Sequence, residues 1–317
     1  MNTSLKLSAA QDRPVLGIGL KIASVCAFMA MVTCIKLSGQ LPPGQIVFFR
    51  SFFAILPIVV WLWFAGSLQG VLKTNHLKGH IARGTIGVCA MALGFYGLTR
   101  LPLPDAIAIG YSRPLFLVVF GALFLGEVIR VYRWSAVAVG LVGVVIITWP
   151  NLDALRDGEL NDREALGALA TLLSACLAAL AFVLVRKLIH TETTPTIVLY
   201  FSMTASGFAL LSIPFGWEPL APGQIIALVS AGFCGGLGQI LLTQSYRFAD
   251  TGTIAPFEYT SVILSIAIGI VLFAEYPTWA VIFGSAIVIA SGVFIIWREN
   301  LRGSKAQAAR PVITPQG

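Results

Sequence analysis

Five long stretches of the chain contain no charged residue, and they constrain the fold more than any other feature. They cover residues 134–152, 165–185, 193–217, 219–246 and 276–297. A transmembrane helix needs about 20 predominantly apolar residues to cross about 30 Å of hydrocarbon. Each stretch is therefore long enough to span a bilayer, which excludes a soluble protein.

Five further stretches are as apolar, but each carries a charge in its interior or near an end. They cover residues 15–37, 43–65, 81–99, 103–126 and 251–274. Charged residues make up only 11% of the 317-residue chain, against about 25% in a typical soluble domain. The ten stretches together predict an all-α polytopic membrane protein with ten transmembrane helices.

The positive charges predict the orientation in the membrane. Ten spans place both termini on one side, and cytoplasmic loops carry an excess of Lys and Arg. Fifteen of the 21 Lys and Arg residues fall on the side of the N-terminus. We therefore expect both termini in the cytoplasm. The net charge of +7 then reflects topology, and no nucleic-acid partner is expected.

The two halves of the chain repeat each other. Leu16-Gly17 recurs as Leu166-Gly167, 150 positions later, and other matches follow in the same order with offsets of 147 to 151. These matches include Ile46-Val47 with Ile197-Val198, Ile107-Ala108 with Ile254-Ala255, and Glu127 with Glu275. Chance similarity between apolar segments is the alternative. An odd number of spans in each unit forces the two units into opposite orientations, a common plan among transporters.

These features divide the chain into five parts. We expect a cytoplasmic N-terminal segment (1–14), a first five-helix repeat (15–150), an external loop (151–164), a second five-helix repeat (165–298) and a disordered cytoplasmic tail (299–317).

Motifs near the fourth helix of each half resemble a known family, the paired EamA domains of the drug/metabolite transporter superfamily. The motifs are Pro114-Leu115-Phe116 and Leu125-Gly126-Glu127 in the first half, and Pro256-Phe257-Glu258-Tyr259 and Phe273-Ala274-Glu275-Tyr276-Pro277 in the second. The resemblance covers about residues 15 to 298. It implies ten helices in an inverted repeat around a central cavity, in a bacterial inner membrane. An Arg at position 113 is not part of the general family pattern.

The resemblance implies a secondary transporter of a small organic metabolite that works by alternating access. Residues 42–51 and 101–106 are similar to the branch that contains bacterial riboflavin transporters, so riboflavin or another vitamin-like solute is one expectation. Export of amino acids, drugs or other metabolites is the alternative. No cofactor or metal is expected, and the protein is expected as a monomer or homodimer in the lipid bilayer.

Two charges inside the membrane mark the candidate substrate site. A central Arg costs about 2.5 to 3.5 kcal/mol on insertion scales, so it usually faces the bundle interior or an aqueous cavity. Arg113 and Glu258 lie within equivalent helices of the two halves. We expect them to face one central cavity, where they either pair or bind opposite ends of a polar substrate. A buried ion pair that locks the halves together is the alternative.

Neighbouring residues complete the predicted site. Tyr111, Ser112 and Tyr259 lie next to the two charges and offer hydroxyls and aromatic faces. Pro114 and Pro256 each remove a helix hydrogen bond, which either frees a carbonyl near the site or only kinks the helix for packing.

Two other features bear on the mechanism. Gln239 lies among Gly235, Gly236 and Gly238, which suggests either substrate binding or close helix packing. Glu258 is the candidate proton carrier. Without such a carrier, the protein would be an exchanger or facilitator.

The remaining candidate charges are assigned structural or gating roles. Arg50 is expected to extend outward to the membrane surface, and Glu127 and Glu275 end equivalent helices. An embedded enzyme would need a nucleophile and base or a metal set within reach of one another. The three histidines are expected in cytoplasmic loops, and no nucleotide-binding motif occurs, so a transporter is favoured over an enzyme.

Overall fold

The computed structural model describes residues 13–64, 66, 68, 70–125, 131–156, 163–188, 191–249 and 251–308, and this part of the chain is all-helical. The first half contains α1 (Pro14–Leu37), α2 (Pro43–Phe64), α3 (Leu77–Leu98), α4 (Leu103–Gly110), α5 (Arg113–Leu125) and α6 (Val131–Arg156). The second half contains α7 (Arg163–Leu188), α8 (Thr194–Leu210), the 3₁₀-helix η1 (Ile213–Phe215), α9 (Pro222–Phe248), α10 (Thr251–Ile254), the 3₁₀-helix η2 (Ala255–Tyr259), α11 (Thr260–Phe273) and α12 (Trp279–Ala308).

The predicted helical membrane fold is confirmed. Within the described residues, 9 helices are long and apolar enough to cross a membrane, with α4 and α5 counted as one span. The predicted span 193–217 is represented by the shorter apolar helix α8, followed by η1. In both halves the predicted fourth span is a broken helix, made of α4 and α5 or of α10, η2 and α11.

Two predicted boundaries are wrong. The loop expected from residue 151 begins later, because α6 continues to Arg156. The disorder expected from residue 299 does not begin there, because α12 continues to Ala308. The segment 299–308 that is added to α12 contains Ala, Lys, Arg and Gln, which are good helix formers. Extending an existing helix also needs no new nucleation.

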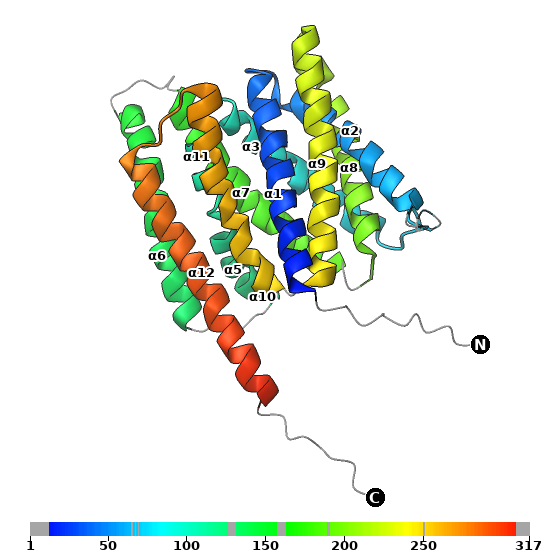
Figure 1. Cartoon of the computed structure of the whole chain (residues 1–317). Coiled ribbons are helices and arrows are strands. Elements are labelled where there is room, and N and C mark those ends of the chain that lie inside the picture. Colours follow the sequence, from blue (N-terminus) through cyan, green and yellow to red (C-terminus); the bar gives the residue numbers. More distant parts are fainter. Residues whose placement is uncertain are drawn as a thin grey trace, which may run out of the picture.

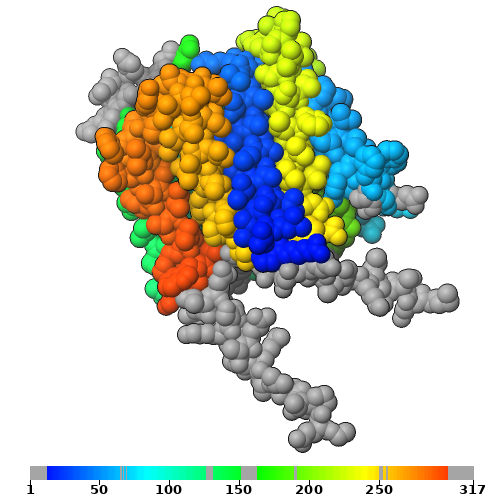
Figure 2. Space-filling model, in the orientation of Figure 1, coloured from blue at the N-terminus to red at the C-terminus, as the bar shows by residue number. Residues whose placement is uncertain are grey.

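The helices of one half pack mainly on helices of the other. α1 lies between α9 and α11 on one face (Figures 1 and 2), while α3 packs on α7, and α6 packs on α12. Exchanging the halves turns the α1–α9 contact into the α3–α7 contact. The α6–α12 contact, in which Gly143 and Gly284 face each other's carbonyls, is exchanged with itself. This pattern is what an inverted repeat produces, and the small residues let the helix backbones approach closely.

The two ends of the described chain lie at the same end of the bundle. α1 begins there and α12 ends there (Figure 1). An even number of spans requires this arrangement. The assignment of that end to the cytoplasm stays a prediction from the loop charges.

Candidate functional site

The two broken helices meet inside the bundle. α4 ends at Gly110 and α5 begins at Arg113, while η2 separates α10 from α11. Pro114 and Pro256 lie at these breaks, where each lacks the N–H that a continuous helix would use. Discontinuous helices at the interface between repeats commonly form the substrate and ion sites of transporters.

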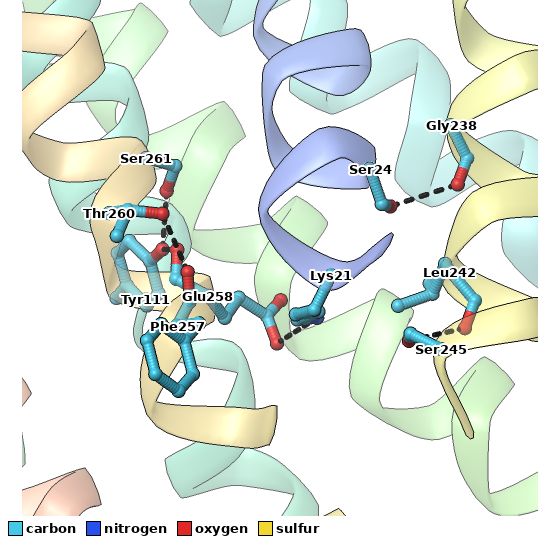
Figure 3. A network of polar contacts seen from close by, with 10 residues as sticks. All are labelled: Lys21, Ser24, Tyr111, Gly238, Leu242, Ser245, Phe257, Glu258, Thr260 and Ser261. Carbon is cyan, nitrogen blue, oxygen red and sulfur yellow. Dashed lines mark hydrogen bonds and ion pairs between the residues drawn. The ribbon is translucent and has the colours of Figure 1, made fainter. Parts of the chain in front are cut away.

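A compact polar group joins the two breaks. We call it the helix-break cluster: Lys21, Tyr111, Glu258, Tyr259 and Ser261. Figure 3 shows its members Lys21, Tyr111, Glu258 and Ser261. The Tyr111 hydroxyl donates to the backbone carbonyl of Glu258 at 2.7 Å and also hydrogen-bonds the Ser261 hydroxyl. The rings of Tyr111 and Tyr259 lie 5.0 Å apart. The predicted site residues Tyr111, Glu258 and Tyr259 are therefore neighbours.

The carboxylate of Glu258 pairs with Lys21 on α1. Lys21 Nζ donates to Glu258 Oε2 at 3.3 Å (Figure 3). The Lys21 side chain is 4% exposed and the Glu258 side chain 56% exposed, so the ammonium is buried and the carboxylate is partly open. Sequence reasoning assigned Lys21 to the cytoplasmic charges and missed this contact.

The expected ion pair between Arg113 and Glu258 is wrong. Glu258 binds Lys21 instead, and the Arg113 side chain is exposed. The helix break explains the difference. The turn at Tyr111 and Ser112 interrupts the helix before α5 begins at Arg113, so Tyr111 is the residue that reaches the opposite break. The alternative, in which Arg113 and Glu258 bind opposite ends of a substrate, stays a prediction.

A cavity of about 60 Å³ lies elsewhere, among α2, α3, α8 and α9. We call it the arginine cavity, after the two cations in its wall. Its lining residues are Arg50, Ala54, Ile58, Arg83, Val198, Phe201, Ser202, Gly235, Gly236 and Gln239. Ser202 and Gly235 are the central residues of α8 and α9, so the cavity lies at mid-length of these helices.

Neither arginine of this cavity is paired with an acid among the residues that the structure describes. Nε of Arg50 and both Nε and Nη1 of Arg83 are buried and make no hydrogen bond within the described residues. The Arg83 guanidinium lies 3.6 Å from the ring centre of Phe201, a cation–π contact that leaves its N–H groups unsatisfied. None of the described residues that line the cavity is acidic.

The outward extension expected for Arg50 is wrong, because this side chain lines the arginine cavity. Gly235 on α9 leaves the necessary room, since a Cβ there would lie 3.4 Å from Arg50 Nε. Arg83 was missed as a site residue. The signal that could have found it was the same as for Arg113, a single charge inside a predicted span. Gln239 lines the cavity, so of the predicted site residues it alone lies beside the two arginines.

A smaller cavity of about 10 Å³ adjoins the first. The two share Ile58, Val198 and Gln239 in their walls. The smaller one extends to Trp61 near the end of α2 and Thr194 at the start of α8. Together they lead from mid-bundle toward the end where α2 finishes.

Glu275 is bound within the chain. It pairs with Lys36 at 2.7 Å and accepts a hydrogen bond from the backbone N–H of Leu103 at 2.7 Å. These contacts tie α1 and the start of α4 to the corner between α11 and α12. Glu127 lies outside the described residues.

Two more residues depart from simple expectation. His80 is not in a loop but lies buried in α3, with Nε2 3.9 Å from a carboxylate oxygen of Glu192 and its ring 4.5 Å from that of Tyr200. Ser112 is fully buried, and its hydroxyl has no hydrogen-bond partner within the described residues. No group of three or more potential metal ligands occurs in the described part of the chain.

Comparison with known proteins identifies the family. The EamA-like transporter family matches residues 16–149 and 165–297. The chain belongs to this family. Membership places this EamA-like transporter in the drug/metabolite transporter superfamily, as a multi-pass membrane protein with two EamA domains.

Curated relatives are transporters rather than enzymes. The S-adenosylmethionine uptake transporter of Rickettsia bellii is 28% identical over 309 residues, which cover 96% of this chain and 99% of the relative. The pseudopaline exporter CntI of Pseudomonas aeruginosa is 30% identical over 289 residues, covering 88% and 93%. The chain is thus similar over almost its whole length to both an importer and an exporter.

The fold also occurs among solved structures. One of these is a protein crystal structure with a TM-score of 0.61 and 18% sequence identity, covering 88% of this chain and 96% of that chain. At this identity the similarity concerns the fold alone.

Proposed function

We propose that this EamA-like transporter carries a small organic metabolite across a bacterial inner membrane by alternating access, with both termini in the cytoplasm. The observation that carries the proposal is the arginine cavity. It lies at mid-length of α8 and α9, and its wall comes from both repeats. A site at the interface of two inverted repeats can open to either side when one repeat moves against the other.

The helix-break cluster supplies the contacts that such a movement would change. Tyr111 and Glu258 connect the two breaks, and Lys21 connects α1 to the second one. Broken helices are natural hinge points, since the backbone already departs from a regular helix there. Arg113, Tyr111, Ser112 and Tyr259 keep their proposed role as substrate contacts.

Two substrate classes are to be tested first. The relatives suggest S-adenosylmethionine, which one of them takes up according to its name. The similarity of the first half to riboflavin transporters suggests riboflavin or another vitamin-like solute. Export of amino acids, drugs or other metabolites is the alternative, and a relative named as an exporter supports keeping it.

Glu258 is the proposed proton carrier. The Glu258 side chain is 56% exposed, and the side chain of its counter-ion Lys21 is 4% exposed. Protons can therefore reach the carboxylate without any opening of the structure around the ion pair. Protonation of Glu258 would break the ion pair and release α1 from the second helix break. Proton binding would thereby be coupled to the relative movement of the repeats.

The test is counterflow in liposomes that contain the purified full-length chain. Vesicles loaded in turn with S-adenosylmethionine, riboflavin, single amino acids or a cationic drug are diluted into the same labelled solute. We expect one class to accumulate transiently above the protein-free control. No accumulation for any class, with the protein inserted and folded, would contradict the transporter proposal.

A further inference from the structure

Two cations with buried N–H groups share the arginine cavity, and its wall holds no anion among the described residues to balance them. The described lining contains Arg50 and Arg83 but no acidic residue. Burying an unpaired charge is costly, and buried charges in proteins are normally paired or bound to a ligand. The Phe201 ring lies against the Arg83 guanidinium, but it accepts no hydrogen bond from the N–H groups in the guanidinium plane.

We infer that Arg50 and Arg83 bind a carboxylate group of the transported solute. This inference rests on the proposed transport function and names the chemical class of its substrate. The unpartnered donors are Nε of Arg50 and Nε and Nη1 of Arg83. A guanidinium offers its N–H groups in a planar fork that matches the two oxygens of a carboxylate.

The dimensions and the wall of the cavity fit this group. A water needs roughly 10–15 Å³ of such space, so about 60 Å³ holds a few waters or the carboxylate that displaces them. Ala54, Ile58 and Val198 give the wall an apolar character, which strengthens charge interactions inside it. Ser202 and Gln239 add neutral polar groups at the same cavity.

The glycines of α9 keep the binding position open. At Gly235 a Cβ would lie 3.4 Å from Arg50 Nε and 2.8 Å from Met31 Sδ. At Gly236 a Cβ would collide with Pro57 and the backbone of Ala54. The adjoining smaller cavity, with Trp61 and Ile240 in its wall, marks the direction in which the apolar part of the solute would extend from its carboxylate.

A carboxylate fits better than a phosphate. Both anions can bind arginine, but a phosphate brings more charge and more acceptor oxygens. The cavity is small, and beyond the two arginines its described lining offers only Ser202 and Gln239 as side-chain donors for those oxygens. The two anions are separate arms of the test.

The test measures thermal unfolding of the purified full-length chain in detergent at constant ionic strength. The probes are butyrate, the neutral isostere butyramide, and inorganic phosphate. We expect butyrate to raise the Tm in a saturable manner by about 2–4 °C near tenfold its Kd. Butyramide should have no effect. Equal shifts with butyrate and butyramide, or a larger shift with phosphate, would overturn the inference.

Variants localise the response. Arg50→Gln and Arg83→Gln should each abolish the butyrate shift, while Arg163→Gln, an exposed arginine at the start of α7, should retain it. If a Gln variant does not fold, the Arg→Lys variant at that position keeps the charge and loses the fork, and most of the shift should disappear. A full shift in either Lys variant, or in either Gln variant, contradicts the assignment.

The result is separable from the transport assay. A butyrate-specific shift without counterflow of any solute would refute the proposed transport function and leave the carboxylate site in place. Counterflow without a butyrate-specific shift would do the opposite.

Discussion

The helix-break cluster and the arginine cavity both place polar groups between the two repeats, but they differ in how these groups are satisfied. In the cluster, Lys21 has Glu258, and the Tyr111 hydroxyl has a backbone carbonyl and Ser261. In the cavity, the buried N–H groups of Arg50 and Arg83 have no acceptor among the described residues. The polar groups of the cluster have partners within the chain, whereas the N–H groups of the cavity are available to a ligand.

This difference separates two kinds of work. Buried polar groups are almost always hydrogen-bonded, so an unsatisfied group needs an explanation such as a bound ligand. A satisfied network holds one arrangement of the chain and specifies its geometry. The cluster is therefore suited to holding or releasing a relative position of the repeats, and the cavity to receiving a solute.

The largest effect is expected from removing one cavity arginine. Arg83→Gln or Arg50→Gln should lower kcat/KM for transport about 10- to 100-fold, because a hydrogen bond to a charged group contributes about 1.5–3 kcal/mol. Initial rates of counterflow with the solute that the counterflow screen identifies measure this effect. Arg163→Gln serves as the control, since it also removes one arginine. Unchanged transport in both cavity variants would place the substrate elsewhere and favour Arg113.

Two neighbouring glycines in the cavity wall should respond differently to substitution by alanine, with a larger loss of stability at Gly236 than at Gly235. In Gly236→Ala the new methyl would lie 2.7 Å from the Ala54 carbonyl and 2.5 Å from Pro57 Cγ, so the backbone of α2 must move. Overpacking of this kind costs about 1–3 kcal/mol. In Gly235→Ala the nearest atom is the sulfur of the flexible Met31, and the cost should be smaller. Thermal unfolding compares the two, and equal losses would contradict the described packing of α9 on α2.

The spans and the repeat could be predicted because both depend on composition along the chain. Any segment such as 165–185 must cross the membrane as a helix whatever it contacts. Matches such as Leu16-Gly17 with Leu166-Gly167 needed no knowledge of packing. The breaks were foreshadowed by Pro114 and Pro256, whose missing N–H acts locally.

The pairing of the interior charges could not be predicted, because it depends on helix phase and on neighbours distant in sequence. A turn at Tyr111–Ser112 was enough to bring Tyr111 rather than Arg113 to Glu258. Lys21 and Arg83 were read as topology signals because they lie near the ends of their spans. The inward direction of Arg50, into the arginine cavity, depends on the space that Gly235 leaves on α9.

In the helix-break cluster, removing either partner of the Lys21–Glu258 ion pair should reduce stability by a different amount. Glu258→Gln leaves the buried ammonium of Lys21 without its carboxylate, which should cost about 1–2 kcal/mol. Lys21→Met removes the buried charge and leaves a carboxylate that is 56% exposed and can be hydrated, so its cost should be less than about 1 kcal/mol. Thermal unfolding of both variants at one pH measures the difference.

Glu258→Gln also tests proton coupling. If Glu258 carries the proton, Glu258→Gln should remove the dependence of uptake on a pH gradient while counterflow persists. Uptake that still follows the gradient in Glu258→Gln would sink the proton-carrier role. A larger stability loss in Lys21→Met than in Glu258→Gln would contradict the burial of the ammonium.

The smallest effect is expected from one hydroxyl. Tyr111→Phe removes the hydrogen bond to the Glu258 carbonyl but keeps the ring beside Tyr259, so stability should fall by about 0.5–1.5 kcal/mol. Tyr200→Phe is a matched control, because the Tyr200 hydroxyl also donates to a backbone carbonyl, that of Leu72, at 2.8 Å. Both variants should lose similar stability in thermal unfolding. Only Tyr111→Phe should change the counterflow rate, since only Tyr111 connects the two helix breaks. If the two variants transport alike, the cluster is a structural contact and the movement of the repeats has its hinge elsewhere.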